Sequence, residues 1–167
     1  FGTALPVGVA SLEEWVVVSF RRPIEVDSLA GSLNRELPQG LRFTRIETLR
    51  PKKQHPQPEG EAFLLTTNGS CAQFMADWGL FLERTHFSWQ KKTKKGPKEI
   101  DIRPFVHTAA LQGTSSIRLV FDWRQGYINP LQIIKAVNPE LSPGSFSLCK
   151  TAQFFNLQEA LSASQQE

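Results

Sequence analysis

The sequence predicts an α+β fold, and two observations support this class. Apolar, β-branched runs alternate along the chain with segments of helical periodicity. The first six expected elements follow the order strand–helix–strand twice, which is typical of a ferredoxin-like split βαβ sandwich. Right-handed crossovers then place the helices on one face of an antiparallel sheet. A C-terminal β-hairpin and a further helix are expected either to extend that sheet or to pack as a small subdomain.

The first three elements are expected between residues 14 and 49. Residues 14–20 (EWVVVSF) are apolar on both faces, which favours a central strand that is covered on both sides. Asp27 or Ser28 can cap a helix over residues 28–37, where apolar positions recur every three or four residues. Residues 41–49 then predict a strand with a bulge or an edge position near its middle.

A second strand–helix–strand unit follows. Residues 61–66 predict a buried strand, and residues 71–82 form the clearest amphipathic helix in the chain. Residues 86–93 predict another strand, and residues 94–97 a turn that leads into a return strand over 98–106.

The third group of elements closes the expected domain. Residues 116–124 alternate, which predicts an antiparallel strand with one wet face. The expected inward side chains are Ile117, Leu119, Phe121 and Trp123, and the expected outward ones are Arg118, Val120, Asp122 and Arg124. Asn129 and Pro130 begin a helix that Asn138 and Pro139 stop. We therefore expect one domain over residues 1–150 and a polar tail over 151–167 with a frayed helix from Asn156.

Composition excludes several classes of protein. With 40% hydrophobic and 21% charged residues, the chain is an ordinary globular protein. The longest apolar run, Trp15–Val18, is far shorter than the ~20 residues that cross a bilayer, so no membrane contact is expected. Two cysteines, Cys71 and Cys149, cannot make a disulfide framework, and two thiols at this separation in sequence indicate a reducing cytoplasm.

Motifs for common catalytic chemistry are missing from the sequence. There is no glycine-rich phosphate loop, and His55, His86 and His107 lack metal-ligand spacing, so no metal site is predicted. Cys71 and His86 could pair as nucleophile and base, but Cys71 falls on the apolar stripe of its expected helix. We therefore predict no catalytic residues.

A lysine-rich turn is the most informative segment. Six basic residues and no acidic one occur between Arg84 and Lys98. Clustered ammonium groups repel one another, and a polyanion relieves this repulsion as counterions are released. The candidate RNA-binding residues are Lys91, Lys92, Lys94, Lys95, Lys98, Arg103 and Trp89. The alternative is a solvated turn whose lysines protect an edge strand from aggregation.

Two carboxylates are candidates for orienting a ligand. Asp101 stands two residues before Arg103, so an ion pair on one strand face is expected, with a simple surface salt bridge as the alternative. Glu14 enters the expected central strand from a loop, where binding residues often gather, and it is expected to oppose a cationic group.

Three segments together resemble a known family. These are residues 4–11 (ALPVGVAS) leading to Glu14, residues 33–41 (LNRELPQGL) and residues 94–104 (KKGPKEIDIRP). They are similar to the radical SAM-linked protein family, a domain of unknown function found alone or fused behind a radical SAM enzyme. Members usually begin with a further strand and helix, and this chain starts at Phe1, so we expect a fragment that lacks those two elements.

The resemblance implies a cytoplasmic bacterial accessory domain with RNA as its natural ligand. Two cysteines cannot supply the three thiolates of a radical SAM cluster, so S-adenosylmethionine and the iron–sulfur cluster would belong to a separate domain, in cis or in trans. We expect a non-catalytic module that presents tRNA or rRNA, or an RNA–protein substrate, to that domain. The alternatives are a protein-docking module without nucleic-acid contact and an independent enzyme.

Overall fold

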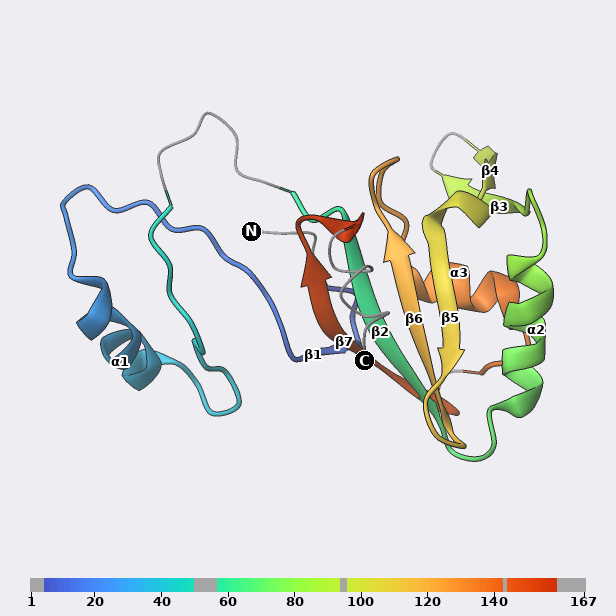
Figure 1. Cartoon of the computed structure of the whole chain (residues 1–167), viewed down its shortest axis with the longest axis horizontal. Coiled ribbons are helices and arrows are strands. Elements are labelled where there is room, and N and C mark those ends of the chain that lie inside the picture. The colour runs from blue at the N-terminus through green and yellow to red at the C-terminus, as the bar shows by residue number, and fades with distance from the viewer. Residues whose placement is uncertain (1–4, 50–56, 94–95, 143, 159–167) are drawn as a thin grey trace. The chain divides into compact units, whose positions relative to one another are not determined.

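The computed structural model describes residues 5–49, 57–93, 96–142 and 144–158 (Figure 1). By its internal contacts the chain divides into two compact units, one formed by residues 1–15 and 56–167 and the other by residues 16–55. The described part of the first unit is a mixed α+β structure with a five-stranded sheet and a separate two-stranded sheet.

The elements of the first unit follow in chain order. They are β1 (Ala10–Ser11), β2 (Gly60–Thr67), α2 (Ala72–Leu82), β3 (Ser88–Thr93), β4 (Gly96–Asp101), a 3-10 turn (Arg103–Phe105), β5 (Val106–Leu111), β6 (Ser116–Asp122), α3 (Pro130–Val137) and β7 (Phe146–Phe154). The second unit contributes α1 (Val26–Glu36).

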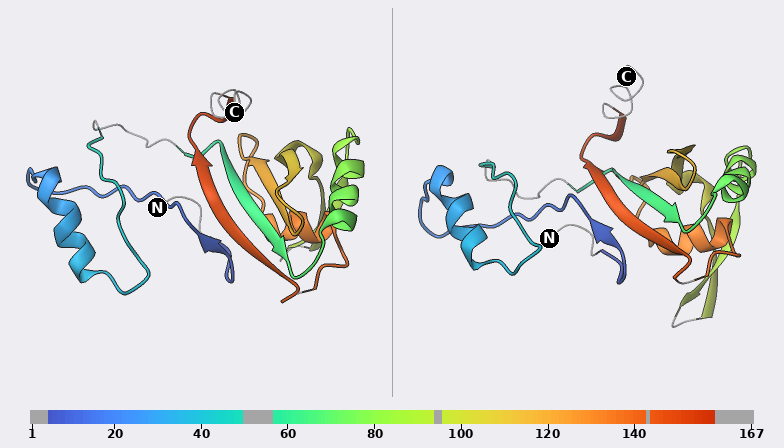
Figure 2. Two further views of the ribbon diagram at one scale, coloured as in Figure 1. Left: turned by 60° about the horizontal axis from the view of Figure 1, so that its bottom comes forward. Right: turned by 90° about the horizontal axis from the view of Figure 1, so that it is seen from below.

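The large sheet has the strand order β1-β7-β2-β6-β5. Its neighbouring strands are antiparallel except for β1, which runs parallel to β7. Helices α2 and α3 lie on the same side of this sheet, as Figures 1 and 2 show. Side chains of both helices join the core of that face; Trp78 of α2 and Ile134 of α3 share one buried cluster with Phe63 of β2.

The opposite face of the sheet is also partly covered. Ala62, Val120 and Leu157 form a small buried cluster there, with Ala152 and Phe154 packed against it. Val120 is fully buried, so its predicted outward, solvated position on the 116–124 strand is wrong. The reason is the chain after β7, which brings Leu157 over this face.

Local patterns identified several elements correctly. The strand expected at 61–66 is β2, the helix at 71–82 is α2, and the helix started by Asn129 is α3. At the start of α3 the Asn129 side chain accepts a hydrogen bond from the Leu131 amide at 2.9 Å, which is a standard N-cap.

The strands expected over residues 14–20 and 41–49 do not form. A β-prone run becomes a strand only when another strand pairs with it, and none does in the described structure. At Phe43 the backbone is bonded instead by the side chain of Asn34, which accepts from its amide at 2.7 Å and donates to its carbonyl at 3.0 Å. The predicted first strand–helix–strand unit is therefore wrong, although its helix is confirmed as α1.

The region between residues 86 and 106 also differs from the prediction. Strands β3 and β4 pair only with each other, and the expected return strand over 98–106 ends at Asp101. Pro104, which has no N–H to donate, begins the 3-10 turn together with Arg103, and the chain then joins the large sheet as β5.

The C-terminal elements belong with the large sheet and do not form a separate subdomain: the strand expected over 116–124 is β6, and α3 packs against the core of the sheet. Strand β6 is central, between β2 and β5, and β7 pairs with the other edge of β2. Because β7 continues to Phe154, residues 151–154 lie in the sheet, and the chain leaves it four residues later than expected.

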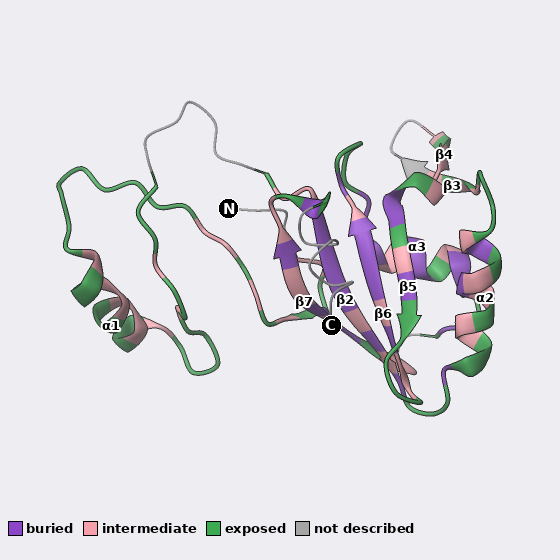
Figure 3. Cartoon of the chain, viewed as in Figure 1, coloured by how far each residue is buried: buried purple, intermediate pink, exposed green. Residues whose placement is uncertain are grey.

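The second unit is built differently. Between residues 16 and 49, all of which are described, no side chain is buried (Figure 3). Helix α1 has no buried residue, although Val17, Val18, Phe20, Ile24 and Leu41 are large, apolar and exposed.

Candidate functional sites

The β3–β4 hairpin carries the predicted polyanion site. Lys91 and Lys98 are directly opposite each other in the pairing of the two strands. Like charges at such positions repel, and no carboxylate makes an ion pair with either lysine in the described part of the chain. The hairpin therefore holds an uncompensated pair of cations.

Trp89 and Ile100 form the neighbouring cross-strand pair on the same face of the hairpin. Both are partly buried and pack against the main core, so Trp89 has a structural role and only part of its ring is accessible. Lys91 is half-buried and Lys98 is exposed. Lys94, Lys95 and the Lys92 side chain lie outside the described residues.

Arg103 anchors the end of α2. Its guanidinium donates to the carbonyl oxygens of Leu82 at 3.0 Å, Arg84 at 3.0 Å and Val106 at 2.7 Å. The same group lies 5.6 Å from the centre of the Phe81 ring. The last carbonyls of a helix lack partners within the helix, so Arg103 acts here as a C-terminal cap.

Asp101 does not form the predicted ion pair with the Arg103 side chain. Its Oδ1 accepts from the backbone amides of Phe87 at 2.9 Å and Arg103 at 3.0 Å, and its Oδ2 is 2.8 Å from His86 Nδ1. Burial raises the pKa of Asp101, but the bonds from Phe87, His86 and Arg103 outweigh it and lower the pKa below its ordinary value. The carboxylate thus joins β4 to the segment before β3.

A second cluster of charged groups was not predicted as a unit. Lys150, on β7, is 1% exposed, and its Nζ lies 2.6 Å from Glu14 and 3.3 Å from Glu61. Glu61 is buried on β2, and its other oxygen accepts from the Trp123 indole at 3.0 Å. The expectation that Glu14 opposes a cationic group is confirmed, since Lys150 is that cation.

Two further polar side chains belong to this cluster. Gln153 is directly opposite Glu61 in the β2–β7 pairing, so both project from the same face of the sheet. Gln153 is 7% exposed, and neither atom of its amide has a partner in the described structure. Tyr127 packs its ring 5.0 Å from that of Trp123, and burial together with the charges of Glu61 and Glu14 raises the pKa of its hydroxyl to about 12.

A β-bulge in β7 brings these groups together. The register between β2 and β7 shifts between Ala62 and Phe63, which leaves Thr151 as an extra residue. Lys150 and Gln153, three positions apart, therefore face the same side. In the sequence, the cluster is indicated only by Lys150, a charged residue within a strand-like segment. Because residues 151–167 were predicted to be a polar tail, this segment was not recognised as a strand.

The remaining candidates from the sequence are not brought together. The Cys71 thiol is buried against the Thr114 and Ser116 carbonyls at 3.4 and 3.5 Å, whereas His86 bonds Asp101. Among the described residues, no three His, Cys, Asp or Glu side chains are grouped to hold a metal ion.

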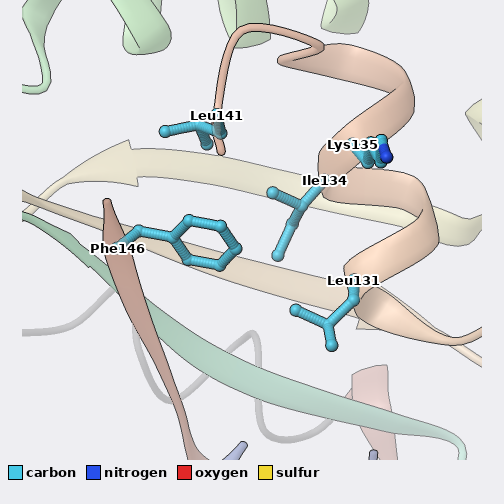
Figure 4. Close-up of a pocket in the computed structure, with 5 residues that line it drawn as sticks. All are labelled: Leu131, Ile134, Lys135, Leu141 and Phe146. Carbon is cyan, nitrogen blue, oxygen red and sulfur yellow. The ribbon is translucent and has the colours of Figure 1, made fainter. Parts of the chain in front are cut away.

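Two cavities occur elsewhere on the helix-covered side. One of about 190 Å³ is almost wholly apolar; Leu131, Ile134, Leu141 and Phe146 converge on it, and Lys135 points away (Figure 4). The other, of about 120 Å³, lies beside Asp77, Phe81 and Arg84. Neither is lined by the Lys150 cluster.

The fold and these sites define an α+β protein with a cationic hairpin and a buried ionic cluster. The chain belongs to the bacterial family DUF2344, described as an uncharacterized protein conserved in bacteria, which it matches over residues 1–139. No curated protein and no solved structure matches the chain. In the described part, no helix has the length and apolar character needed to cross a membrane.

Proposed function

We propose that this protein binds RNA through the β3–β4 hairpin. The observation that carries the proposal is the uncompensated, cross-strand pair of Lys91 and Lys98. Trp89, half-buried beside them, leaves part of an aromatic ring on the same face, where a base can stack. Arg103 contributes indirectly, because its guanidinium is engaged by carbonyl groups of the protein.

The biological setting of this proposal is an accessory domain of a radical SAM protein in the bacterial cytoplasm. Membership of DUF2344 supports only the bacterial origin, and the link to radical SAM proteins rests on the three motifs that resemble the radical SAM-linked family. In this setting S-adenosylmethionine and the iron–sulfur cluster are held by a separate domain, and this chain presents the RNA.

Salt dependence of binding tests the proposal. Affinity for tRNA and rRNA fragments is expected to fall with salt, and each lost phosphate contact reduces the log–log slope by about 0.7–0.9. Lys91→Gln and Lys98→Gln should each remove about one such contact. The matched control is Lys135→Gln, which removes a lysine on α3 away from the hairpin. A flat slope, or equal effects of all three variants, would overturn the proposal.

A second candidate function is a docking module for the radical SAM domain without nucleic-acid contact. It is favoured by the exposed apolar side chains of residues 16–49, among them Val18 and Phe20. In this case Val18→Ser and Phe20→Ser should weaken binding to the purified radical SAM domain at least tenfold, while Lys91→Gln and Lys98→Gln leave it unchanged. No effect of Val18→Ser and Phe20→Ser would rule out this docking surface.

We also infer that β2, α2, β5, β6, α3 and β7 constitute a ferredoxin-like split βαβ unit. The order β7-β2-β6-β5, with antiparallel neighbours, supports it, because it places the third strand between the first and the second. Both helices on one face are consistent with right-handed crossovers. In this reading β3 and β4 form an insertion between the first helix and the second strand, and the RNA-binding hairpin is that insertion.

A further inference from the structure

The Lys150 cluster lies apart from the hairpin and takes no part in the RNA proposal. A buried ammonium group needs several acceptors and a compensating charge, because removing it from water costs several kcal/mol. Glu61 supplies one charge from within the sheet, but its nearer oxygen is 3.3 Å away and its other oxygen is engaged by Trp123. With Glu61 as its only partner, the Lys150 ammonium group would be weakly bonded.

The closest partner of Lys150 comes from outside the regular structure. Glu14 lies 2.6 Å from the ammonium group, and its side chain is 46% exposed. It follows the two-residue strand β1 in a segment with no helix or strand. A buried cation thus makes its shortest bond to a residue that can leave without breaking the sheet.

One polar side chain on the same sheet face as Glu61 and Lys150 lacks a hydrogen-bond partner in the described structure. The Gln153 amide is more than nine-tenths buried and has no hydrogen-bond partner in the described structure, although it shares a face with Glu61. A buried amide of this kind is costly and indicates a missing ligand or water. Tyr127 is 36% exposed, and its ring centroid lies 5.0 Å from that of Trp123, whose indole donates to Glu61.

We propose that Lys150, Gln153 and Tyr127 form a binding site for a carboxylate ligand, and that Glu14 occupies this site from within the chain until the ligand displaces it. A ligand carboxylate accepts from the ammonium, the amide and the phenol, so the orphaned Gln153 amide gains a partner. Glu61 remains in place and keeps its ion pair with Lys150.

Charge selects a carboxylate over a phosphate or a cation. The two glutamates and Lys150 sum to one negative charge, and exchange of Glu14 for another carboxylate leaves that sum unchanged. A phosphate dianion would add a charge close to Glu61, which repels it. A cation would have to displace Lys150, which is 1% exposed and held within β7.

The test compares the wild-type chain with Glu14→Gln, using acetate as the probe and the Gln153 side-chain amide resonance as the readout. An intrachain carboxylate competes at an effective concentration on the order of millimolar. Glu14→Gln removes this competitor, so acetate is expected to bind at least tenfold more tightly than in wild type. N-acetylglutamate amide, titrated in parallel, presents the carboxylate as a protein side chain does. Tighter binding of this probe than of acetate indicates a partner protein as the source, and the reverse indicates a free acid.

The matched control is Glu13→Gln, which changes the adjacent glutamate, whose carboxylate contacts Trp15 and not Lys150. It should leave acetate affinity at the wild-type value. Gln153→Leu, added to Glu14→Gln, removes the amide donor and should reduce acetate affinity again; in this variant binding is followed by the resonance of the Trp123 indole N–H, which donates to Glu61. Equal acetate affinity in wild type and Glu14→Gln would overturn the proposal and leave the cluster a purely structural ion pair.

Discussion

At the residue scale, the ionisation of Tyr127 can be measured without interference, because it is the only tyrosine in the chain. Burial, assisted by the charges of Glu61 and Glu14, raises its pKa from 10.0 to about 12. A group whose pKa is raised on folding contributes stability below its unfolded pKa, and this contribution is lost as the pH rises through the folded value. The free energy of unfolding should therefore decline between pH 10 and 12.

The absorbance of tyrosinate measures this directly. The folded chain is expected to show one ionisation near pH 12, and the urea-unfolded chain one near pH 10. Glu14→Gln should lower the pKa of Tyr127 in the folded chain, because it removes a nearby negative charge. The decrease should be smaller than the increase that burial causes. A folded transition at pH 10 would contradict the burial of this hydroxyl beside the two carboxylates.

Asp101 should affect the stability of the protein at acidic pH. Its pKa is lowered on folding, so its contribution is complete above the unfolded value of 3.8 and is lost as the pH falls through the folded value. Asp101→Asn weakens the bonds from Phe87 and His86 and should reduce the free energy of unfolding by about 1–3 kcal/mol at pH 7. Urea unfolding at pH 7 and pH 3 checks this, since the deficit should shrink at the lower pH. If Asp101→Asn loses the same free energy of unfolding at pH 7 and at pH 3, the loss is steric and does not come from the charge of Asp101.

The residues that sequence reasoning missed share a physical reason. Lys150 and Glu61 are 89 positions apart, and only the pairing of β2 with β7 brings them together. Nothing local to either residue encodes that pairing. The ion pair expected between Asp101 and the Arg103 side chain is wrong because the partner on Arg103 is its backbone amide, which the 3-10 turn brings to the carboxylate.

At the scale of elements, the close approach of β2 and β6 depends on a residue without a side chain. A Cβ on Gly60 would lie 2.5 Å from the Phe121 carbonyl oxygen and 2.9 Å from Leu157. Because the first contact is backbone, β6 or β2 must shift to accommodate it. Gly60 is therefore required by packing rather than by backbone conformation.

Gly60→Ala should lower the free energy of unfolding by about 1–3 kcal/mol or more, as overpacking does elsewhere. The matched control is Gly79→Ala in α2, where a Cβ meets nothing within 4 Å. Alanine is the better helix former, so this variant should be more stable by about 0.5–1 kcal/mol. Thermal or urea unfolding of both variants is the measurement, and a shift of the same sign in both would refute this account.

The elements that were predicted correctly carry their signal locally. Helix α2 has an apolar stripe that Trp78 and Phe81 bury, and α3 has its own cap in Asn129. Residues 14–20 are a run of apolar, β-prone residues like β2, yet they form no strand. Their apolar side chains predicted a strand, but a strand requires a partner, and partner choice is a property of the whole chain.

At the scale of the whole molecule, stability is unevenly distributed. Residues 60–154 contain four of the five strands of the large sheet and most of its buried core, whereas no side chain among residues 16–49 is buried. Local opening requires little free energy where few apolar contacts must break. Helix α1 should therefore open independently of β2 and β6.

Hydrogen exchange followed by mass spectrometry tests this at peptide resolution. Amides of α1 are expected to exchange at least about a hundredfold faster than those of β2 and β6 at neutral pH. The reason is that α1 rests on its own backbone bonds, while each central strand is bonded along both edges. If the radical SAM domain docks on the exposed apolar side chains of residues 16–49, adding it should slow exchange there and leave β2 unchanged. Protection of α1 equal to that of β2 in the isolated chain would show that these side chains are already covered by the protein itself.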